Sequence, residues 1–351
     1  MAENNLTYEP ALAIDRAIAE LNPSSTVIVT DEIVRAKVFP MLENSKTVKN
    51  SPVIAITPGE EGKTLETVVK IWQLLETTGA SRKSAVVNIG GGVVTDIGGF
   101  AAATFKRGIL VINFPTTLLG AVDAATGGKT GINFNGLKNE IGAFHKPSKV
   151  IISPLPFTTL SQKELMSGYA EMIKSALISD QNFYVELCDI DEILSNKEKL
   201  GKAVEKCVGI KEAIVAQDPR EGGLRKVLNL GHTAGHAFES LKIERQLDVT
   251  HGEAVAHGML VALILSNLKL GFKSEELNYY KNFLKENYPG SMIVCKDVPT
   301  VIEIMAHDKK NPRPGEVSFT LLQRIGEPVI DCSLASSELQ QALEIYIEML
   351  E

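Results

Sequence analysis

The segment NIGGGVVTDIGGF (Asn88–Phe100) predicts a β-strand that turns directly into an α-helix. It overlaps the end of an apolar run, and its three consecutive glycines let the backbone approach a bound group closely. The N–H groups at the start of the helix would favour a pyrophosphate. The segment is not a GxGxxG fingerprint, because the third glycine would fall on Thr95. A tight turn without a ligand is the alternative interpretation.

Strands and helices alternate on both sides of this segment. The strand candidates, rich in Val and Ile, are Thr26–Thr30, Pro52–Thr57, Ser84–Ile89, Ile109–Phe114 and Lys149–Ile152. Between them, helical spacing of apolar residues predicts helices over Lys63–Thr78 and Val93–Thr104. Such alternation implies a largely parallel sheet, with ligands at the carboxyl ends of its strands.

Helical patterns dominate after Pro154. The helix candidates are Gln162–Ser179, Lys197–Ala216, Leu224–Leu241, Gly252–Leu270, Ser274–Asn287, Pro299–Ala306 and Ser336–Leu350, and Glu316–Leu322 is one late strand. The sequence therefore predicts an α/β protein in two domains. Residues 1–154 would form a Rossmann-like domain with a mostly parallel sheet, and residues 155–351 an α-helical domain, with a cleft between them.

Composition narrows the class of protein. The chain has 351 residues, 44% of them hydrophobic, which is enough for two domains, and its net charge of −7 argues against nucleic-acid binding. The four cysteines are far apart, which favours a reducing compartment. We see no signal peptide, and the most apolar segment, Val255–Leu270, is too short and too polar to span a membrane. We expect a soluble cytoplasmic protein.

The segment Leu228–Gly258 carries four of the six histidines, which are His232, His236, His251 and His257. The first two are spaced i, i+4, so a helix would place both imidazoles on one face. Neutral imidazole is a common ligand of divalent metals, and a core of hydrogen-bonded histidines is the alternative. In SGYAEMIKSALIS, apolar neighbours around Glu171 and Lys174 hint at a buried carboxylate. Glu with two histidines is a known divalent ligand set.

A second polar cluster lies in FPTTLLGAVDAATGGKTGINFNGLKN (Phe114–Asn139). Its GGKT looks like the end of a phosphate-binding P-loop, but the first glycine would have to be Asp123, whose carboxylate would repel a triphosphate. The remaining polar set suits a phosphate or carboxylate and a sugar hydroxyl, and comprises Thr116, Thr117, Asp123, Lys129, Lys138 and Asn139. A solvated hairpin is the alternative for the lysines.

Ten motifs in one order resemble the 3-dehydroquinate synthases of the sugar-phosphate cyclase family. The match is collinear from about Asp31 to Gly326, and the motifs read PGEEGK, GGGVVTD, KRG, PTTLLGAVDAATGGKTGIN, GLKN, SGYAEMIK, EGGLR, LNLGHTAGHA, HGEAVA and DKK. The resemblance implies a divalent metal, usually zinc with cobalt as a substitute, tightly held NAD⁺ and a homodimer. The substrate would be a small sugar phosphate, with no nucleic acid or membrane as partner.

The resemblance also assigns site residues. The metal ligands would be Glu171, His232 and His251, instead of the pair His232 and His236 that spacing alone favours. NAD would contact Asp31, Glu60, Lys63, Gly91, Gly92, Val93, Asp96, Thr116, Thr117, Leu119, Asp123, Lys138, Thr159, Leu160 and Glu164. The substrate would contact Arg107, Asp123, Lys129, Asn139, Lys174, Lys211, Arg225, Asn229, His236, Lys309 and Lys310.

Within these sets the catalytic residues would be Lys129, Lys174, Glu221, Arg225 and His236. In the family's pattern, Arg107 comes from the partner subunit and Glu221 matches a proton acceptor. Only one of Lys309 and Lys310 would reach the substrate. One position departs from the family, because Ile33 stands where an asparagine is usual.

The implied reaction converts 3-deoxy-D-arabino-heptulosonate 7-phosphate to 3-dehydroquinate and phosphate. It is a lyase step of the shikimate pathway to aromatic amino acids. It would proceed by NAD-mediated oxidation, phosphate elimination, reduction, ring opening and aldol closure.

Several alternatives share part of this pattern. Polyol dehydrogenases of the glycerol dehydrogenase type have Asp where Glu171 stands and lack the GGKT–GLKN lysines. Other cyclases act on heptulose or hexose phosphates, whereas Arg225 with Lys211 favours a substrate that bears a carboxylate. A P-loop module fails at Asp123, and a zincin-type protease fails because Thr233 replaces the general-base glutamate.

Overall fold

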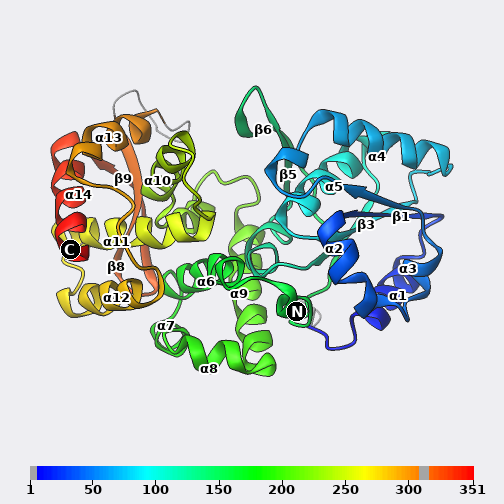
Figure 1. The fold of residues 1–351 in the computed structure, drawn as a ribbon, viewed down its shortest axis with the longest axis horizontal. Helices are drawn as coiled ribbons and strands as arrows, with labels where there is room; N and C mark the ends of the chain where they lie inside the picture. The colour runs from blue at the N-terminus through cyan, green and yellow to red at the C-terminus, as the bar shows by residue number, and fades with distance from the viewer. Residues whose placement is uncertain (1–5, 308–315) are drawn as a thin grey trace. The chain divides into compact units, whose positions relative to one another are not determined.

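The computed structural model describes residues 6–307 and 316–351, which form two compact units (Figure 1). Unit 1 contains the described residues up to Leu165 together with Glu192–Glu212. Unit 2 contains Met166–Asp191 and Ala213–Glu351. The chain therefore passes between the units after Leu165, after Asp191 and after Glu212.

A five-stranded parallel sheet organises unit 1. Its strands are β1 (Thr26–Asp31), β2 (Val53–Ile56), β3 (Ala85–Gly90), β4 (Leu110–Pro115) and β7 (Lys149–Val150), in the order β2-β1-β3-β4-β7. All five predicted strands are confirmed, with ends that differ by one or two residues. The strand order changes direction between β1 and β3, and open parallel sheets bind ligands at the carboxyl ends of strands at such a point.

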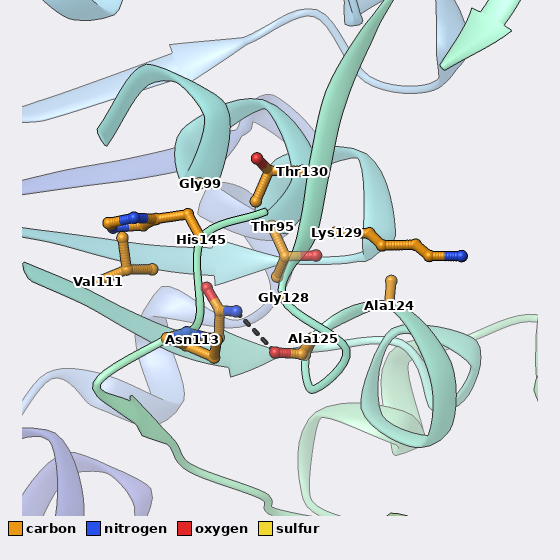
Figure 2. Close-up of a pocket in the computed structure, with 11 residues that line it drawn as sticks. Thr95, Gly99, Val111, Asn113, Ala124, Ala125, Gly128, Lys129, Thr130 and His145 are labelled. Atoms are coloured by element: carbon orange, nitrogen blue, oxygen red, sulfur yellow. Dashed lines mark hydrogen bonds between the residues drawn. The ribbon is translucent and has the colours of Figure 1, made fainter. Parts of the chain in front are cut away.

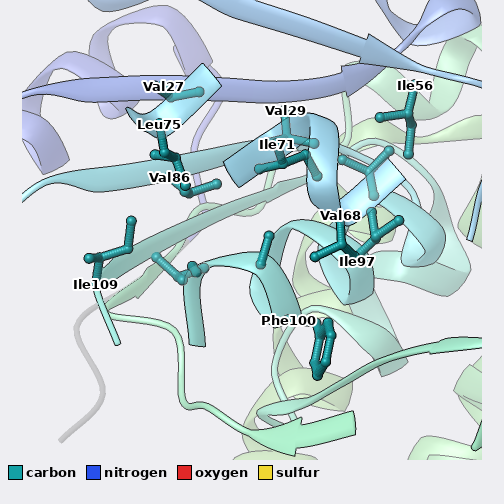
Figure 3. Close-up of a cluster of buried hydrophobic side chains, with 14 of the residues drawn as sticks. Val27, Val29, Ile56, Val68, Ile71, Leu75, Val86, Ile97, Phe100 and Ile109 are labelled. Atoms are coloured by element: carbon teal, nitrogen blue, oxygen red, sulfur yellow. The ribbon is translucent and has the colours of Figure 1, made fainter. Parts of the chain in front are cut away.

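Helices cover both faces of this sheet because its side chains alternate between two apolar layers. Val27 and Val29 of β1 pack in the layer of α4 (Leu65–Thr77) and α5 (Gly92–Thr104), which Figure 3 shows. Ile28, between them, packs in the opposite layer, with α1 (Pro10–Leu21) and α2 (Glu32–Lys37). The predicted helices at α4 and α5 are confirmed, whereas α1, α2 and the short α3 (Lys46–Asn50) were not predicted.

The polar segment after β4 folds as a short helix and a hairpin. Thr117 begins a turn that leads into the π-helix η4 (Gly120–Ala124), and β5 (Lys129–Phe134) pairs with β6 (Leu137–Phe144) in antiparallel register. The remaining elements of unit 1 are η1 (Phe39–Leu42), η2 (Glu60–Gly62), η3 (Phe105–Arg107), η5 (Pro156–Thr159), most of α8 (Ile190–Ser195) and most of α9 (Lys197–Gln217). The solvated hairpin considered for the two lysines is therefore present, and both lysines are exposed.

Unit 2 is built around α11 (His251–Leu270), whose residues are buried almost all round. Its neighbours are α10 (His232–Glu244), α12 (Ser274–Asn287), α14 (Ser336–Leu350) and β8 (Val317–Arg324). The other elements are α6 (Gln162–Leu177), α7 (Gln181–Leu187), η6 (Leu224–Asn229), η7 (Cys295–Asp297), α13 (Val298–Ala306) and β9 (Glu327–Leu334). By length and composition α11 could cross a membrane, which corrects the expectation that Val255–Leu270 is too short and too polar to do so. Buried core helices of water-soluble proteins pass the same test, and α11 is mostly buried.

Two predictions for this half of the chain need correction. The single helix predicted over Leu224–Leu241 is the 3₁₀-helix η6 followed by α10, and the break falls at Gly231. Gly231 has φ of 79°, and a Cβ there would lie 2.8 Å from the nitrogen of Met259. The left-handed φ ends the helical run at this residue, and the close approach of Met259 leaves room only for glycine. The late strand at β8 is confirmed, but it pairs with a second strand, β9, that was not predicted.

Candidate active site

Two helices of unit 2 each begin with a histidine and lie close together. His232 is the first residue of α10 and His251 the first residue of α11. Glycines allow this approach, because a Cβ at Gly258 would lie only 2.0 Å from the carbonyl oxygen of Gly231. Likewise, a Cβ at Gly252 would lie 1.9 Å from the carbonyl oxygen of Ser167 in α6. These two glycines let α11 approach both α10 and α6, so both imidazoles lie beside α6.

Glu171 of α6 faces these imidazoles from a buried position, with 1% of its surface exposed. Its Oε1 lies 3.6 Å from Nε2 of His232 and 3.8 Å from Nε2 of His251. Its Oε2 forms an ion pair with Lys174. Among the described residues, Oε1 has no hydrogen-bond partner. A buried carboxylate oxygen needs a cation or a hydrogen-bond donor beside it, and this oxygen has neither among the described residues.

These distances fit a divalent ion held by Glu171, His232 and His251. Ligand atoms about 2.1 Å from a tetrahedral ion lie about 3.4 Å from one another. The remaining ring nitrogens are already engaged: Nδ1 of His251 lies 3.2 Å from Oε2 of Glu239, and Nδ1 of His232 lies 3.2 Å from the carbonyl oxygen of Leu230. Both acceptors fix Nδ1 as the protonated nitrogen, so Nε2 of each ring keeps the lone pair that a metal needs.

His236 belongs to the same cluster. Ligand atoms of His232, His236 and His251 lie within 4.8 Å of one another, so the i, i+4 pairing predicted from spacing is also met. The orphaned Oε1 of Glu171 favours the ligand set with the carboxylate. His257 is different, because it is fully buried in α11 and its Nδ1 lies 2.8 Å from the hydroxyl oxygen of Tyr346. Burial lowers the pKa of His257 to about 3, and the core-histidine interpretation is correct for this residue.

Hydrogen bonds in the segment before α10 hold further polar residues of unit 2 in place. Nδ2 of Asn229 donates to Oε1 of Glu221 over 2.8 Å, and the buried Arg225 donates to the carbonyl oxygen of Pro219 over 2.7 Å. Asp218 accepts backbone N–H groups from Gly223 and from Arg225, which lowers the pKa of its carboxyl. These bonds hold Glu221, in the turn before η6, close to Arg225 and Asn229 of η6.

Predicted NAD contacts gather at the carboxyl ends of β1 and β3 in unit 1. Asp31 ends β1 and caps α2 by accepting from the nitrogen of Val34 over 2.8 Å, and its burial raises the pKa of the carboxyl. Gly91 caps α5, where a Cβ would come within 3.0 Å of Thr117. The start of α5 at Gly91 and Gly92 is therefore bare backbone beside the PTT segment, as close approach of a pyrophosphate requires.

A buried ion pair adjoins this turn. Nζ of Lys63 lies 2.6 Å from Oδ2 of Asp96, and burial raises the pKa of Asp96 to about 6. Glu60 accepts from Nδ2 of Asn133 over 2.7 Å, which ties η2 to the β5–β6 hairpin. The hydroxyl of Thr116 is buried, and the described residues offer it no hydrogen-bond partner. These residues fit a polar cofactor lying along the ends of the strands.

The other predicted residues of unit 1 are more spread out. Nζ of Lys211 donates to the carbonyl oxygen of Asp123 over 2.6 Å and pairs with its carboxylate. The carbonyl oxygen of Thr159 accepts from Lys37 at the end of α2, whereas Glu164 is exposed and bonds locally to Ser161. Lys309 and Lys310 lie outside the described residues.

Three predicted site residues hold backbone conformations that side chains usually avoid. Arg107, Asn139 and Glu221 have φ of 68°, 52° and 60°, in the left-handed region. Such strain persists where the surrounding fold imposes it, and it is concentrated at functional sites. Gly92 and Val93 begin α5, and Leu119 lies just before η4. Ile33 on α2 is 52% exposed.

Sequence reasoning missed Glu239, the partner of His251. A signal was available, because His232, His236 and Glu239 in HTAGHAFE are spaced i, i+4, i+7 and share one face of α10. Asn133, the partner of Glu60, could not be found this way, because their contact joins residues 73 positions apart.

The fold and this site define an α/β protein whose second unit carries a buried carboxylate beside three histidines. The family model "3-dehydroquinate synthase N-terminal" matches residues 53–167, and "3-dehydroquinate synthase C-terminal" matches residues 168–311. The chain belongs to the 3-dehydroquinate synthase family. The resemblance found in its motifs is therefore confirmed.

Individual relatives agree with this assignment. The 3-dehydroquinate synthase of Parabacteroides distasonis is 44% identical over 333 residues, which is 94% of both chains. That of Pyrococcus abyssi is 38% identical over 337 residues, 93% of this chain and 95% of the relative.

Among solved structures, the fold is similar to a 2-epi-5-epi-valiolone synthase from Streptomyces hygroscopicus with NAD⁺ and Zn²⁺ bound. The TM-score is 0.83 with 24% identity, covering 99% of this chain and 98% of the other. A 2-deoxy-scyllo-inosose synthase complexed with carbaglucose-6-phosphate, NAD⁺ and Co²⁺ gives a TM-score of 0.82 with 24% identity, covering 98% and 95%. The predicted α/β fold class is confirmed.

Proposed function

We propose that the chain converts 3-deoxy-D-arabino-heptulosonate 7-phosphate to 3-dehydroquinate and phosphate. Family membership over most of the chain supports this activity. The structural observation that carries it is the orphaned Oε1 of Glu171, which faces two histidine nitrogens in a geometry that suits a divalent ion. The reaction breaks a carbon–oxygen bond to phosphate, so the enzyme would be a lyase of the shikimate pathway to aromatic amino acids.

The cofactors would be NAD⁺ and a divalent ion, Zn²⁺ or Co²⁺. When bound, the ion would acidify substrate hydroxyls and the nicotinamide would accept and return a hydride. Glu171, His232 and His251 would hold the ion. The bare first turn of α5 at Gly91 and Gly92 would hold the pyrophosphate of NAD⁺, and the two cyclases of similar fold carry NAD⁺ and a metal.

The charged residues of the chain would position the substrate. The predicted cationic contacts Lys129, Lys174, Lys211 and Arg225 suit a substrate with one phosphate and one carboxylate. Glu221 would accept a proton, and the hydrogen bond from Asn229 fixes the direction of its carboxylate. We assign cofactor binding to residues 1–154 and metal and substrate binding mainly to residues 155–351.

We further propose a homodimer. The β5–β6 hairpin exposes large apolar side chains, namely Phe134, Leu137, Ile141 and Phe144. Exposed apolar side chains grouped on one element suit a protein partner. The exposed Arg107, held in a left-handed conformation, would reach the active site of the partner subunit. Light scattering during size-exclusion chromatography tests the state, and a monomer at micromolar concentration would contradict it.

The same proposal includes a cytoplasmic location. None of the four cysteines forms a disulfide, which suits a reducing compartment. Cell fractionation with antibody detection checks this.

Phosphate release is the direct test of the activity. Purified protein with NAD⁺ and zinc should release phosphate from the heptulosonate phosphate without net accumulation of NADH. Sedoheptulose 7-phosphate and glucose 6-phosphate, which lack a carboxylate, should release much less. Faster release from either of these two sugars would assign the chain to another cyclase activity, and stoichiometric NADH would assign it to a dehydrogenase.

A further inference from the structure

Two asparagines lie side by side inside the parallel sheet of unit 1. Asn88 of β3 and Asn113 of β4 are register partners and have exposed fractions of 0% and 5%. Their neighbours along the strands on the same face, Val86 and Val111, belong to the apolar layer under α4 and α5. Buried amides in an apolar layer are unfavourable unless their hydrogen bonds are made.

The two amides form a directed chain of hydrogen bonds. Nδ2 of Asn88 donates to Oδ1 of Asn113 over 2.8 Å. Nδ2 of Asn113 in turn donates to the carbonyl oxygen of Ala125 over 2.8 Å, the bond that Figure 2 shows. The carbonyl of Ala125 can only accept, so Asn113 must present its NH₂ group to it. A flipped Asn113 amide would place oxygen against oxygen at Ala125 and NH₂ against NH₂ at Asn88. The orientation of both side chains is therefore determined.

Ala125 is the residue that follows the π-helix η4, and it joins two predicted ligand contacts. Asp123 stands two residues before it and Lys129 four residues after it. The last carbonyl groups of any helix accept no N–H from within the helix. Donors from outside η4 therefore help to fix the position of the turn that follows it. Lys211 supplies one such donor to the carbonyl of Asp123 from α9, and Asn113 supplies the other from the sheet.

Packing between this turn and the sheet leaves a gap. A small cavity of about 10 Å³, room for about one water molecule, lies between β4 and the turn and is lined by Asn113, Ala125, Lys129 and His145 among others (Figure 2). Asn88 packs against α5, because a Cβ at Gly98 would lie 1.8 Å from its Oδ1, which has no hydrogen-bond partner among the described residues. Contact with α5 thus holds the Asn88 amide, and Asn113 is the donor aimed at the turn.

We propose that Asn113, oriented by Asn88, is a positioning residue that sets the turn between Asp123 and Lys129 for substrate binding. The role in binding rests on the proposed function, whereas the role in holding the turn does not.

Hydrogen exchange tests the anchoring without any activity measurement. Asn113→Leu keeps a similar side-chain volume and removes both hydrogen bonds, and exchange of the backbone amides of residues 120–128 should then become about tenfold faster. Ile112→Ala is the matched control, because Ile112 is buried on the same strand but faces the opposite layer. It should lower the melting temperature without a local change at residues 120–128. Equal protection of this segment in Asn113→Leu and the wild type would overturn the proposal.

Kinetics tests the consequence for the substrate. At a temperature where both variants are folded, Asn113→Leu should lower kcat/KM for the heptulosonate phosphate about tenfold more than Ile112→Ala does. Asn88→Ala should give a smaller loss of kcat/KM. The double variant should be no worse than Asn113→Leu, because Asn88 acts on the turn only through Asn113. Additive losses would overturn the proposal. If Asn113→Leu shows the exchange effect but the wild-type protein shows no turnover of the heptulosonate phosphate, the proposed function is refuted and the anchoring role stands.

Discussion

Nδ1 of His251 lies 3.2 Å from Oε2 of Glu239, and Nε2 of the same ring lies 3.8 Å from Oε1 of Glu171. The carboxylate of Glu239 thus orients the imidazole, and that of Glu171 faces the side of the ring where an ion would bind. A carboxylate that accepts from a histidine fixes the tautomer and increases the basicity of the opposite nitrogen.

Glu239→Gln should therefore weaken zinc binding about ten- to a hundredfold, because the amide is a weaker acceptor for the N–H of His251. Competition with a chelator of known affinity measures the dissociation constant. Glu244→Gln, an exposed position on the same helix, makes the same change in charge and should leave the constant unchanged. Equal effects of the two variants would show that zinc affinity depends on the net charge of the chain and not on the contact between Glu239 and His251.

His251→Ala should abolish both zinc binding and turnover, because it removes one of the three ligands that we propose for the ion, which are Glu171, His232 and His251. Metal content after dialysis and phosphate release are the two measurements. His307→Ala, which removes an exposed histidine elsewhere, is the control. Full activity of His251→Ala would refute the ligand assignment and leave His232 with His236 as the metal pair.

Lys129→Ala should lower the rate with the heptulosonate phosphate far more than it lowers NAD⁺ retention. The reason is the predicted contact of Lys129 with the anionic substrate, which an alanine cannot make. Steady-state kinetics and the amount of NAD⁺ that copurifies measure the two effects. Lys70→Ala, an exposed lysine on α4, should change neither. Equal losses of rate and NAD⁺ would place Lys129 at the cofactor.

His257 should make the protein acid-sensitive. Its pKa is lowered by burial to about 3 in the folded chain, whereas an unfolded histidine has a pKa of 6.5. Because the folded pKa is the lower one, the unfolded chain binds the proton first. The contribution to stability is complete above about pH 6.5 and is lost as the pH falls towards 3, by about 1.4 kcal/mol per pH unit.

Urea unfolding of His257→Leu and of the wild type between pH 4 and pH 7 measures this slope. The variant should lose less stability per pH unit than the wild type. Parallel curves would mean that His257 takes up its proton without unfolding.

The sequence predicted those parts of the fold that depend on local patterns. Runs of Val and Ile marked every strand of the parallel sheet, helical spacing of apolar residues marked α4, and a long apolar run marked α11. Local patterns could not reveal the break at Gly231, because it depends on the close approach of Met259 from another helix. Strand β9 was missed because Pro328 and Asp331 interrupt its apolar pattern.

The candidate site was predictable to a similar extent. Apolar neighbours of Glu171 indicated a buried carboxylate, and family motifs joined it to His232 and His251. The pairing of Asn88 with Asn113 could not be predicted, because it requires the order of β3 and β4 in the sheet. Contacts of this kind depend on tertiary structure, which no spacing in the chain encodes.

The interleaving of the two units also bears on synthesis at the ribosome. Unit 1 includes Glu192–Glu212, and within that stretch Lys211 donates to the carbonyl oxygen of Asp123. The nascent chain must therefore emerge past residue 212 before its first unit can be completed, and by then Met166–Asp191 is already outside the tunnel. A fragment that ends near residue 154 would leave Asp123 without its lysine, so such a truncation is a poor choice for expressing the cofactor-binding half alone.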